Sequence, residues 1–155
     1  MRLDADGLKT TPAGQARRYV FNLMEEVLTK MSKGLILSTS FVFFVYGLLC
    51  LFFPVEVLRY VVEGSVSSAS GIIEVRSNFG GLYISIAVIL YMLASKETTI
   101  RVGLISVLII MLGMAAGRSL GFFIDGSPTW AMHLYLSLEI IIASLSIMLL
   151  TKNQG

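Results

Sequence analysis

Four long runs of apolar residues constrain this chain more than any other feature. They cover residues 36–53, 72–95, 100–124 and 130–150, with polar segments between them. Each is close to the roughly 20 residues that a helix needs to cross a bilayer. Because no water satisfies backbone groups at mid-membrane, such runs must be helices or belong to a closed barrel, and the alternating segments of about ten residues typical of a barrel do not occur. The runs predict an all-α, polytopic membrane protein, a bundle of four transmembrane helices.

The composition supports the same class. Of the 155 residues, 55% are hydrophobic and 14% are charged, whereas a soluble domain carries about 25% charged residues. We predict that residues 33–155 form one four-span membrane domain. Residues 1–32 then make a polar tail and an amphipathic helix, which leaves no room for a separate soluble catalytic domain.

The distribution of Lys and Arg residues predicts the orientation of the bundle. With four spans, both termini lie on one side, which holds nine of the 12 basic residues, while Arg59, Arg76 and Arg118 lie on the other. Because Lys and Arg are enriched in cytoplasmic segments, we expect both termini to be cytoplasmic. The formal net charge of +2 reflects this asymmetry. We expect no nucleic-acid partner, since binding nucleic acid requires a dense basic patch.

The segment before the first span has the pattern of an amphipathic helix. Thr11 and Pro12 are typical of a helix start, with Thr as the cap. Beyond them, apolar residues recur at helical spacing on one face and charged residues occupy the other. The apolar set is Tyr19, Val20, Leu23, Met24, Val27, Leu28 and Met31. This helix is expected to lie on the cytoplasmic membrane surface, to dock on a partner, or to cover the end of the bundle; these alternatives stay open.

Small residues recur at every fourth position in two of the runs. The second run contains Ser77, Gly81 and Ser85, and the third contains Gly113, Gly117 and Gly121. Such stripes let a neighbouring helix approach closely in lipid. We interpret both stripes as packing sites for other helices of the same chain, with homodimerisation through the same face as the alternative.

Two charged residues lie inside apolar runs. Glu139 is near the middle of residues 130–150, and Arg118 is about two turns before the end of residues 100–124. An ionised side chain at mid-membrane costs at least about 2.5 kcal/mol, so it must be paired, face a wet cavity or have a function. Consecutive spans run in opposite directions, so both residues lie in the outer half, roughly 9 and 14 Å inside their helix ends at 1.5 Å per residue. We therefore predict an Arg118–Glu139 ion pair.

Further polar residues fall in the same half of the membrane, namely Glu74, Arg76, Asn78 and Asp125. Glu74 is expected to pair with Arg118 and to hydrogen-bond Asn78 one turn on, and Asp125 is expected to pair with Arg76. Three interpretations stay open. The residues form a closed charge network that fixes helix register, a pocket for a small ligand or lipid headgroup, or a site of chemistry or proton movement that uses Glu139.

No catalytic motif accompanies these residues. His133 is the only histidine, which excludes a metal site with several histidines, and no Gly-rich phosphate loop follows a strand. We therefore predict no cofactor, and we assign no catalytic and no metal-binding residue.

The order of the polar residues resembles that of a known family. A first span closing on Phe53-Pro54 precedes Glu74-Val75-Arg76 and Gly80-Gly81-Leu82-Tyr83; then come Gly117-Arg118, Asp125-Gly126 with Pro128, and Leu138-Glu139. Over residues 31–152 this pattern is similar to small bacterial membrane proteins catalogued as domain of unknown function 4345. The resemblance implies a four-helix membrane bundle, with Glu74, Arg76, Arg118, Asp125 and Glu139 as shared positions, and we expect this bundle to lie in the bacterial inner membrane. It implies no activity, and residues 1–30 depart from the family pattern.

From the sequence we favour a non-enzymatic membrane protein. Its outer-half polar pocket would bind a small or lipidic ligand, or the chain would be an accessory subunit of a larger membrane complex. The expected partners are bilayer lipids, a lipid or small-molecule ligand, and copies of this chain or other subunits. The alternative is a proton-coupled carrier or an intramembrane enzyme that uses Glu139 and Arg118. A cavity beside these residues would favour binding, whereas a dry, fully paired network would favour a structural role.

Overall fold

The computed structural model describes residues 12–64, 66–126 and 128–152, in which every regular element is helical. In chain order these are α1 (Pro12–Phe52), α2 (Pro54–Val62), α3 (Ala69–Val75), the π-helix η1 (Arg76–Gly81), α4 (Leu82–Ala94), the 3-10 turn η2 (Glu97–Thr99), α5 (Ile100–Ile124) and α6 (Trp130–Lys152). Four helical stretches are long and apolar enough to cross a membrane: Gly14–Phe52, Ala69–Ala94, Glu97–Ile124 and Trp130–Lys152. The predicted fold class, a four-transmembrane-helix bundle with a helical N-terminal segment, is confirmed.

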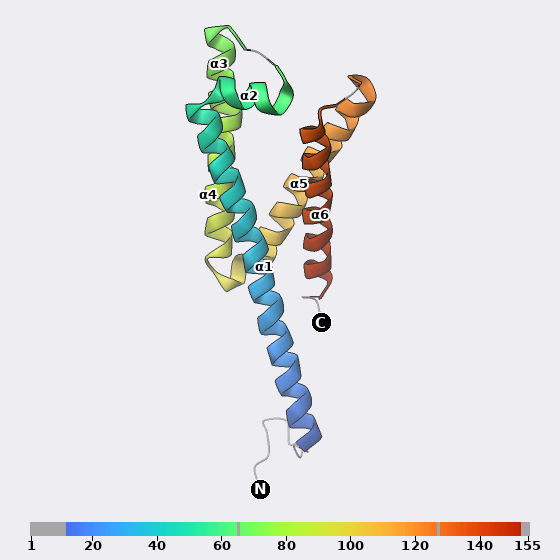
Figure 1. Cartoon of the computed structure of the whole chain (residues 1–155). Helices are drawn as coiled ribbons and strands as arrows, with labels where there is room; N and C mark the ends of the chain where they lie inside the picture. The colour runs from blue at the N-terminus through green and yellow to red at the C-terminus, as the bar shows by residue number, and fades with distance from the viewer. Residues whose placement is uncertain (1–11, 65, 127, 153–155) are drawn as a thin grey trace.

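The four spans form two helix hairpins that diverge from each other. Helix α1 packs along α4, and α5 packs along α6, whereas contacts between the two pairs are fewer. Figure 1 shows the pairs close together at the lower end, where η2 and the end of α6 lie, and apart at the upper end, where α2 and α3 lie. Helix α2 extends from α1 toward α6 at this upper end, and the Thr129 hydroxyl donates a hydrogen bond to the Val61 carbonyl at 3.4 Å.

The hydrophobic core lies mainly in the lower half, where the hairpins meet. Its most buried members come from α1, α4 and α5, and they are Ile36, Ala87, Leu90, Ala94, Leu104 and Val107. The buried Ser40 hydroxyl donates a 2.7 Å hydrogen bond to the Ala87 carbonyl and so joins α1 to α4. Higher up, α5 still packs on α6 but its other faces are open, and Phe123 is 90% exposed. The structure is therefore tightly packed below and open above.

The amphipathic segment and the first span form a single helix. The predicted helix after residue 12 is confirmed, but α1 continues without a break from Pro12 to Phe52, although we placed a boundary near residue 33. No proline interrupts this stretch, and an isolated glycine such as Gly34 costs only about 1 kcal/mol; Pro54 then begins the next helix. The expected Thr11 cap lies outside the described residues.

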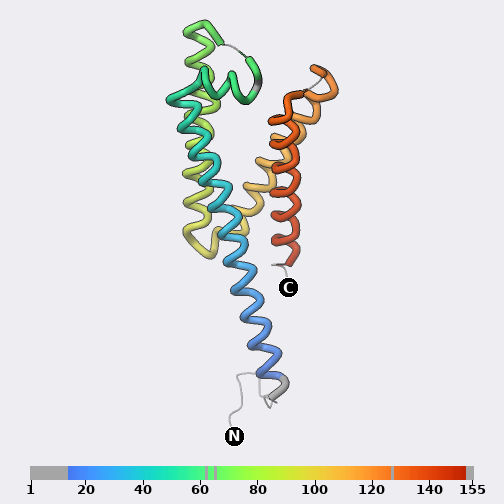
Figure 2. The backbone as a smooth tube through the Cα atoms, in the orientation of Figure 1, coloured from blue at the N-terminus to red at the C-terminus, as the bar shows by residue number. Residues whose placement is uncertain are grey.

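The N-terminal part of α1 extends beyond the rest of the bundle. The whole of α1 has 41 residues and spans roughly 60 Å at 1.5 Å per residue, about twice the hydrocarbon thickness of a bilayer. Figures 1 and 2 show this part below the end of α6. Most of its apolar side chains, including Tyr19, Leu23 and Val27, are exposed, and only Leu28 joins the core.

Removal of residues 1–30 is expected to leave membrane insertion intact. The shortened chain, beginning at Met31, keeps the apolar run 36–53 and the core residue Ile36. It loses one buried side chain, Leu28, which contributes about 1.5 to 3 kcal/mol. Carbonate extraction of membranes followed by a thermal melt in detergent checks both points. If the shortened chain appears in the soluble or aggregated fraction, the projecting helix is required for folding.

Close packing within the α1–α4 hairpin uses two glycines, Gly47 and Gly80, that lie outside the two predicted stripes. A Cβ on Gly47 would lie 3.0 Å from the backbone N of Ile84 and 3.0 Å from the backbone O of Gly80. A Cβ on Gly80 would lie 3.1 Å from the Cα of Leu51. Gly80 belongs to the π-helix η1, so α1 and the second span approach each other closely at this irregular turn.

No other helix of the described chain packs closely against the two predicted small-residue stripes. A Cβ on Gly113 or Gly117 would meet no atom within 4 Å, and Gly121 would meet only the Asp125 side chain at 3.5 Å. Ser77, Gly81 and Ser85 are exposed, and the Ser85 hydroxyl donates to the Gly81 carbonyl of its own helical turn. The divergence of the hairpins removes the neighbours that these stripes would have. Packing of either stripe against another chain stays a prediction.

Candidate functional site

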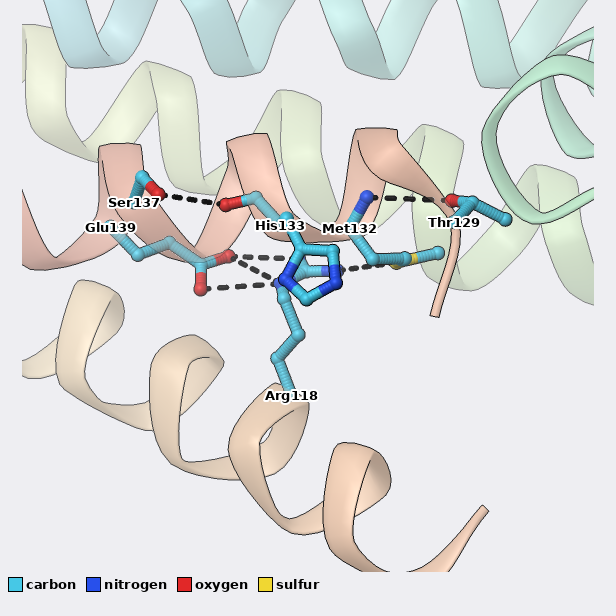
Figure 3. A network of polar contacts seen from close by, with 6 residues as sticks. All are labelled: Arg118, Thr129, Met132, His133, Ser137 and Glu139. Atoms are coloured by element: carbon cyan, nitrogen blue, oxygen red, sulfur yellow. Dashed lines mark hydrogen bonds and ion pairs between the residues drawn. The ribbon is translucent and has the colours of Figure 1, made fainter. Parts of the chain in front are cut away.

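Arg118 and Glu139 meet across the α5–α6 hairpin. Because α5 and α6 are antiparallel neighbours, a residue near the end of α5 lies beside one in the first half of α6 (Figure 3). The Nη2 of Arg118 lies 2.8 Å from Oε1 of Glu139. The Nε donates to the same oxygen at 3.2 Å and to Oε2 at 3.3 Å. The predicted ion pair is confirmed, with the two-nitrogen geometry that makes an arginine–carboxylate pair strong.

The rest of the Arg118 guanidinium contacts weak partners. Its Nη1 donates to the Met132 sulfur at 2.9 Å (Figure 3), and a thioether is a weak acceptor. The Tyr135 ring lies beside the cation, with its centroid 5.4 Å from the guanidinium carbon, within range of a cation–π interaction. The cation is thus held on one side by a carboxylate and on the others by soft, apolar groups.

The ion pair lines a cavity instead of being fully enclosed. The Glu139 side chain is 5% exposed and that of Arg118 is 18% exposed. Both line a cavity of about 160 Å³ whose wall has residues from all four spans. Around the pair, the wall includes Phe43 and Tyr46 of α1, Tyr83 of α4, and Tyr135 and Leu138 of α6. A charged pair and three tyrosines therefore share an otherwise apolar cavity between the hairpins.

A second, larger cavity adjoins the first. It has a volume of about 470 Å³ and follows the exposed glycine face of α5, with Gly113, Gly117 and Gly121 in its wall. It extends to Asp125 and Pro128 at the upper end of the hairpin. Tyr83, Met114 and Arg118 line both cavities. We call the two cavities together the cleft, and the Arg118 side chain lies where they join.

The remaining predicted polar residues divide into separate groups. The Asn78 amide donates to Oε1 of Glu74, as expected, and Arg76 donates to the Leu51 carbonyl of α1. Within the described ranges, no ion pair joins Glu74 to Arg118 or Asp125 to Arg76. The physical reason is the divergence of the hairpins, because Glu74 and Arg76 belong to one hairpin and Arg118 and Asp125 to the other. The residues that we expected to form a single cluster are therefore divided between the two hairpins.

Sequence reasoning missed the tyrosines of the cleft. Tyr46 and Tyr83 lie with their rings 5.3 Å apart, and Phe43 packs against Tyr83 at 5.2 Å. We had no reason to separate them from the aromatic residues common in membrane helices. A usable signal was present, because Tyr46 and Tyr83 carry hydroxyls in the interior of apolar runs, where a polar group without a partner is costly.

His133 does not line the cleft, although it packs against Phe122, which does. Its ring lies 5.0 Å from that of Phe122, and its backbone carbonyl accepts a hydrogen bond from Ser137 (Figure 3). The described part of the chain contains no group of three or more His, Cys, Asp or Glu side chains placed to hold a metal ion.

Comparison with known proteins identifies a family. No curated protein and no solved structure matches the chain. The family described as Domain of unknown function (DUF4345) matches residues 31–150. This range includes the four apolar runs and every residue of the cleft, and it excludes the N-terminal part of α1 that extends beyond the bundle. The chain belongs to this family.

Proposed function

We propose that this protein is a non-enzymatic protein of the bacterial inner membrane that binds a lipid or small-molecule ligand in the cleft. Both termini are cytoplasmic in this proposal, because basic residues are concentrated beside them. The upper end in Figure 1 then faces outward, and the cleft lies in the outer half of the bilayer. The ligand enters sideways from the membrane, between the diverging hairpins.

One observation carries the proposal: the Arg118–Glu139 pair lines a cavity formed by all four spans. If the pair served only to fix the register of α5 against α6, we would expect apolar side chains to enclose it. A cavity beside the pair has no part in fixing the register. Ligand sites are mostly apolar concave surfaces with a few placed polar groups. The cleft has this character, and an intramembrane ion pair is by default a functional position.

The test is native mass spectrometry of the gently extracted protein. We expect the wild-type chain to retain a lipid-sized or smaller ligand at activation energies that remove loosely bound lipids. Gly117→Leu should lose this ligand, because the added side chain fills the groove beside Arg118, where a Cβ at present meets no atom within 4 Å.

Gly34→Leu is the matched control. Gly34 also lies in a helix with no atom within 4 Å of an added Cβ, but it does not line the cleft. This variant should keep the ligand at the wild-type level. A wild-type protein that retains no ligand, or equal retention by all three proteins, would contradict the proposal.

A second role, as a subunit of a larger membrane complex, is favoured by the exposed glycine face of α5. Gly113 and Gly117 have open space before them, and small residues at this spacing let another helix approach closely. The same mass spectra separate the two roles. A retained copy of this chain or another subunit, lost in Gly117→Leu, supports the subunit role, whereas a small ligand on a single chain supports binding.

A further inference from the structure

We infer that the ligand of the cleft is an amphiphile whose head group is uncharged and accepts hydrogen bonds, with the head group placed against Arg118. The inference rests on the proposed function and adds the chemical class of the ligand. It follows from the hydrogen-bonding groups of the cleft, from their formal charges, and from the shape of the groove beside them.

The first argument is the unused hydrogen-bonding capacity of Arg118. A guanidinium has five N–H donors. Protein acceptors are present for three of them: the Nε–H, one N–H of Nη2 and one N–H of Nη1, the last facing only a sulfur. Among the described residues, the other two N–H groups have no acceptor. Arg118 is therefore able to donate to a ligand without breaking its pair with Glu139.

The second argument is that the remaining polar groups are also able to donate, since a phenolic hydroxyl both donates and accepts a hydrogen bond. The hydroxyls of Tyr83 and Tyr135 form no hydrogen bond within the described part of the chain, although both side chains line the cavity. The two Glu139 oxygens, the obvious acceptors, are already bonded to Arg118. A ligand that enters this cavity thus meets several free donors, whereas the carboxylate already accepts three hydrogen bonds from Arg118, so a head group that supplies acceptors fits the cavity best.

The third argument is the charge of the cleft. The formal charges of Arg118 and Glu139 cancel each other. The only other charged residue in the described walls of the cleft is Asp125, at the exposed end of the groove. An anionic head group would be an uncompensated charge in a low-dielectric site and would also be repelled by Asp125. A cationic head group would meet the donors of Arg118. Ketone, ester and quinone-like carbonyls satisfy the donors without adding charge.

The groove beside Arg118 suits the apolar part of such a molecule. From Gly113 to Gly121 the glycine face runs roughly 12 Å along α5 at 1.5 Å per residue. No side chain projects from it, and a Cβ at Gly113 or Gly117 would meet nothing within 4 Å. A chain or flat ring system lying on this face would bury apolar surface against the helix while its head group reaches Arg118.

The test compares probes that share one alkyl chain and differ in the head group. Methyl hexadecanoate is uncharged and has acceptors, hexadecyl sulfate is a permanent anion, hexadecyltrimethylammonium is a permanent cation, and hexadecane has no head group. Each is titrated into the full-length protein in one detergent and followed by native mass spectrometry. We expect the methyl ester to bind at least tenfold more tightly than each of the other three probes.

Two variants assign that preference to the cleft. Arg118→Lys keeps the positive charge opposite Glu139 but loses donors, and it should weaken ester binding at least fivefold while leaving hexadecane binding unchanged. Tyr135→Phe removes one hydroxyl without changing the ring, and it should weaken ester binding about twofold to fivefold. Gly34→Leu should bind every probe as the wild type does, and a thermal melt of each variant shows whether it is folded.

The outcomes separate the inference from the proposed function. Tighter binding of the sulfate or the ammonium probe, abolished by Gly117→Leu, would overturn the uncharged head group but leave the cleft as a binding site. Equal binding of hexadecane and the ester would overturn the role of Arg118 as a donor. Failure of all four probes to bind the wild-type protein would overturn both.

Discussion

Replacing Arg118 with leucine is expected to destabilise the protein by about 3 to 5 kcal/mol, because the change leaves the carboxylate of Glu139 buried and unpaired. Glu139 is only 5% exposed, and its recorded side-chain partner is Arg118. Replacing both residues with leucine should cost much less, since exchanging a buried ion pair for apolar residues of similar volume is often neutral or stabilising. The order of thermal stability should be wild type close to the double variant, with Arg118→Leu clearly below both.

Two further variants sharpen this double-mutant cycle. Glu139→Leu should cost less than Arg118→Leu, because the Arg118 side chain is 18% exposed against 5% for Glu139, and it keeps its contacts with the Met132 sulfur and the Tyr135 ring. Arg118→Lys should fall between the wild type and Arg118→Leu, since it keeps the charge but loses the two-nitrogen contact. Thermal melts in one detergent measure all of these differences. A double variant no more stable than Arg118→Leu would contradict the expected rescue, and a loss equal to the sum of the two single losses would show that the two residues act independently.

The sequence predicts the helices and the ion pair because both depend on local or nearest-neighbour information. The length of an apolar run decides whether a helix can span a bilayer. The α5–α6 pairing follows from the short connection between two antiparallel spans, so the depths of Arg118 and Glu139 are enough to place them together. The Glu74–Asn78 contact is likewise one helical turn apart.

The openness of the bundle depends on information that the runs do not contain. In lipid, apolar surface alone does not drive two helix pairs together, because lipid tails are as apolar as leucine side chains. Association then depends on shape and on polar contacts, which the upper half has within α5–α6 but not between α5 and α4. We expected Glu74 to reach Arg118 because both residues lie in the same half of the membrane. The structure instead has them in different hairpins.

The contacts of the glycines are likewise not predictable from the sequence alone. Gly47, Gly80, Gly113 and Gly117 are alike as sequence features, and a regular spacing of four drew our attention to the wrong face for contacts within the chain. Only the three-dimensional arrangement distinguishes a glycine that faces the backbone of another helix from one that faces open space. This distinction leads to a prediction in which chemically identical substitutions have opposite effects.

Gly47→Ala is expected to destabilise the protein by about 1 to 3 kcal/mol, the usual cost of inserting a methyl group into a packed contact. The new Cβ would lie 3.0 Å from backbone atoms of both Gly80 and Ile84. Backbone atoms in a helix cannot move aside as a side chain does, so α1 and the second span must separate. The loss is measured as the drop in melting temperature in detergent.

Two other glycines provide graded controls for this loss. Gly117→Ala places its methyl group in open space and should be neutral or stabilising, because alanine is favoured over glycine in a helix by about 1 kcal/mol. Gly103→Ala should lie between them, since its Cβ would meet mainly Cδ1 of Ile36, the far end of a flexible side chain, at 2.8 Å. Equal losses at all three positions would mean that the helices pack no more tightly at Gly47 than at Gly103 or Gly117. A large loss at Gly117 alone would mean that a ligand or a partner helix occupies the groove, because no atom of the described chain lies within 4 Å of the added methyl group.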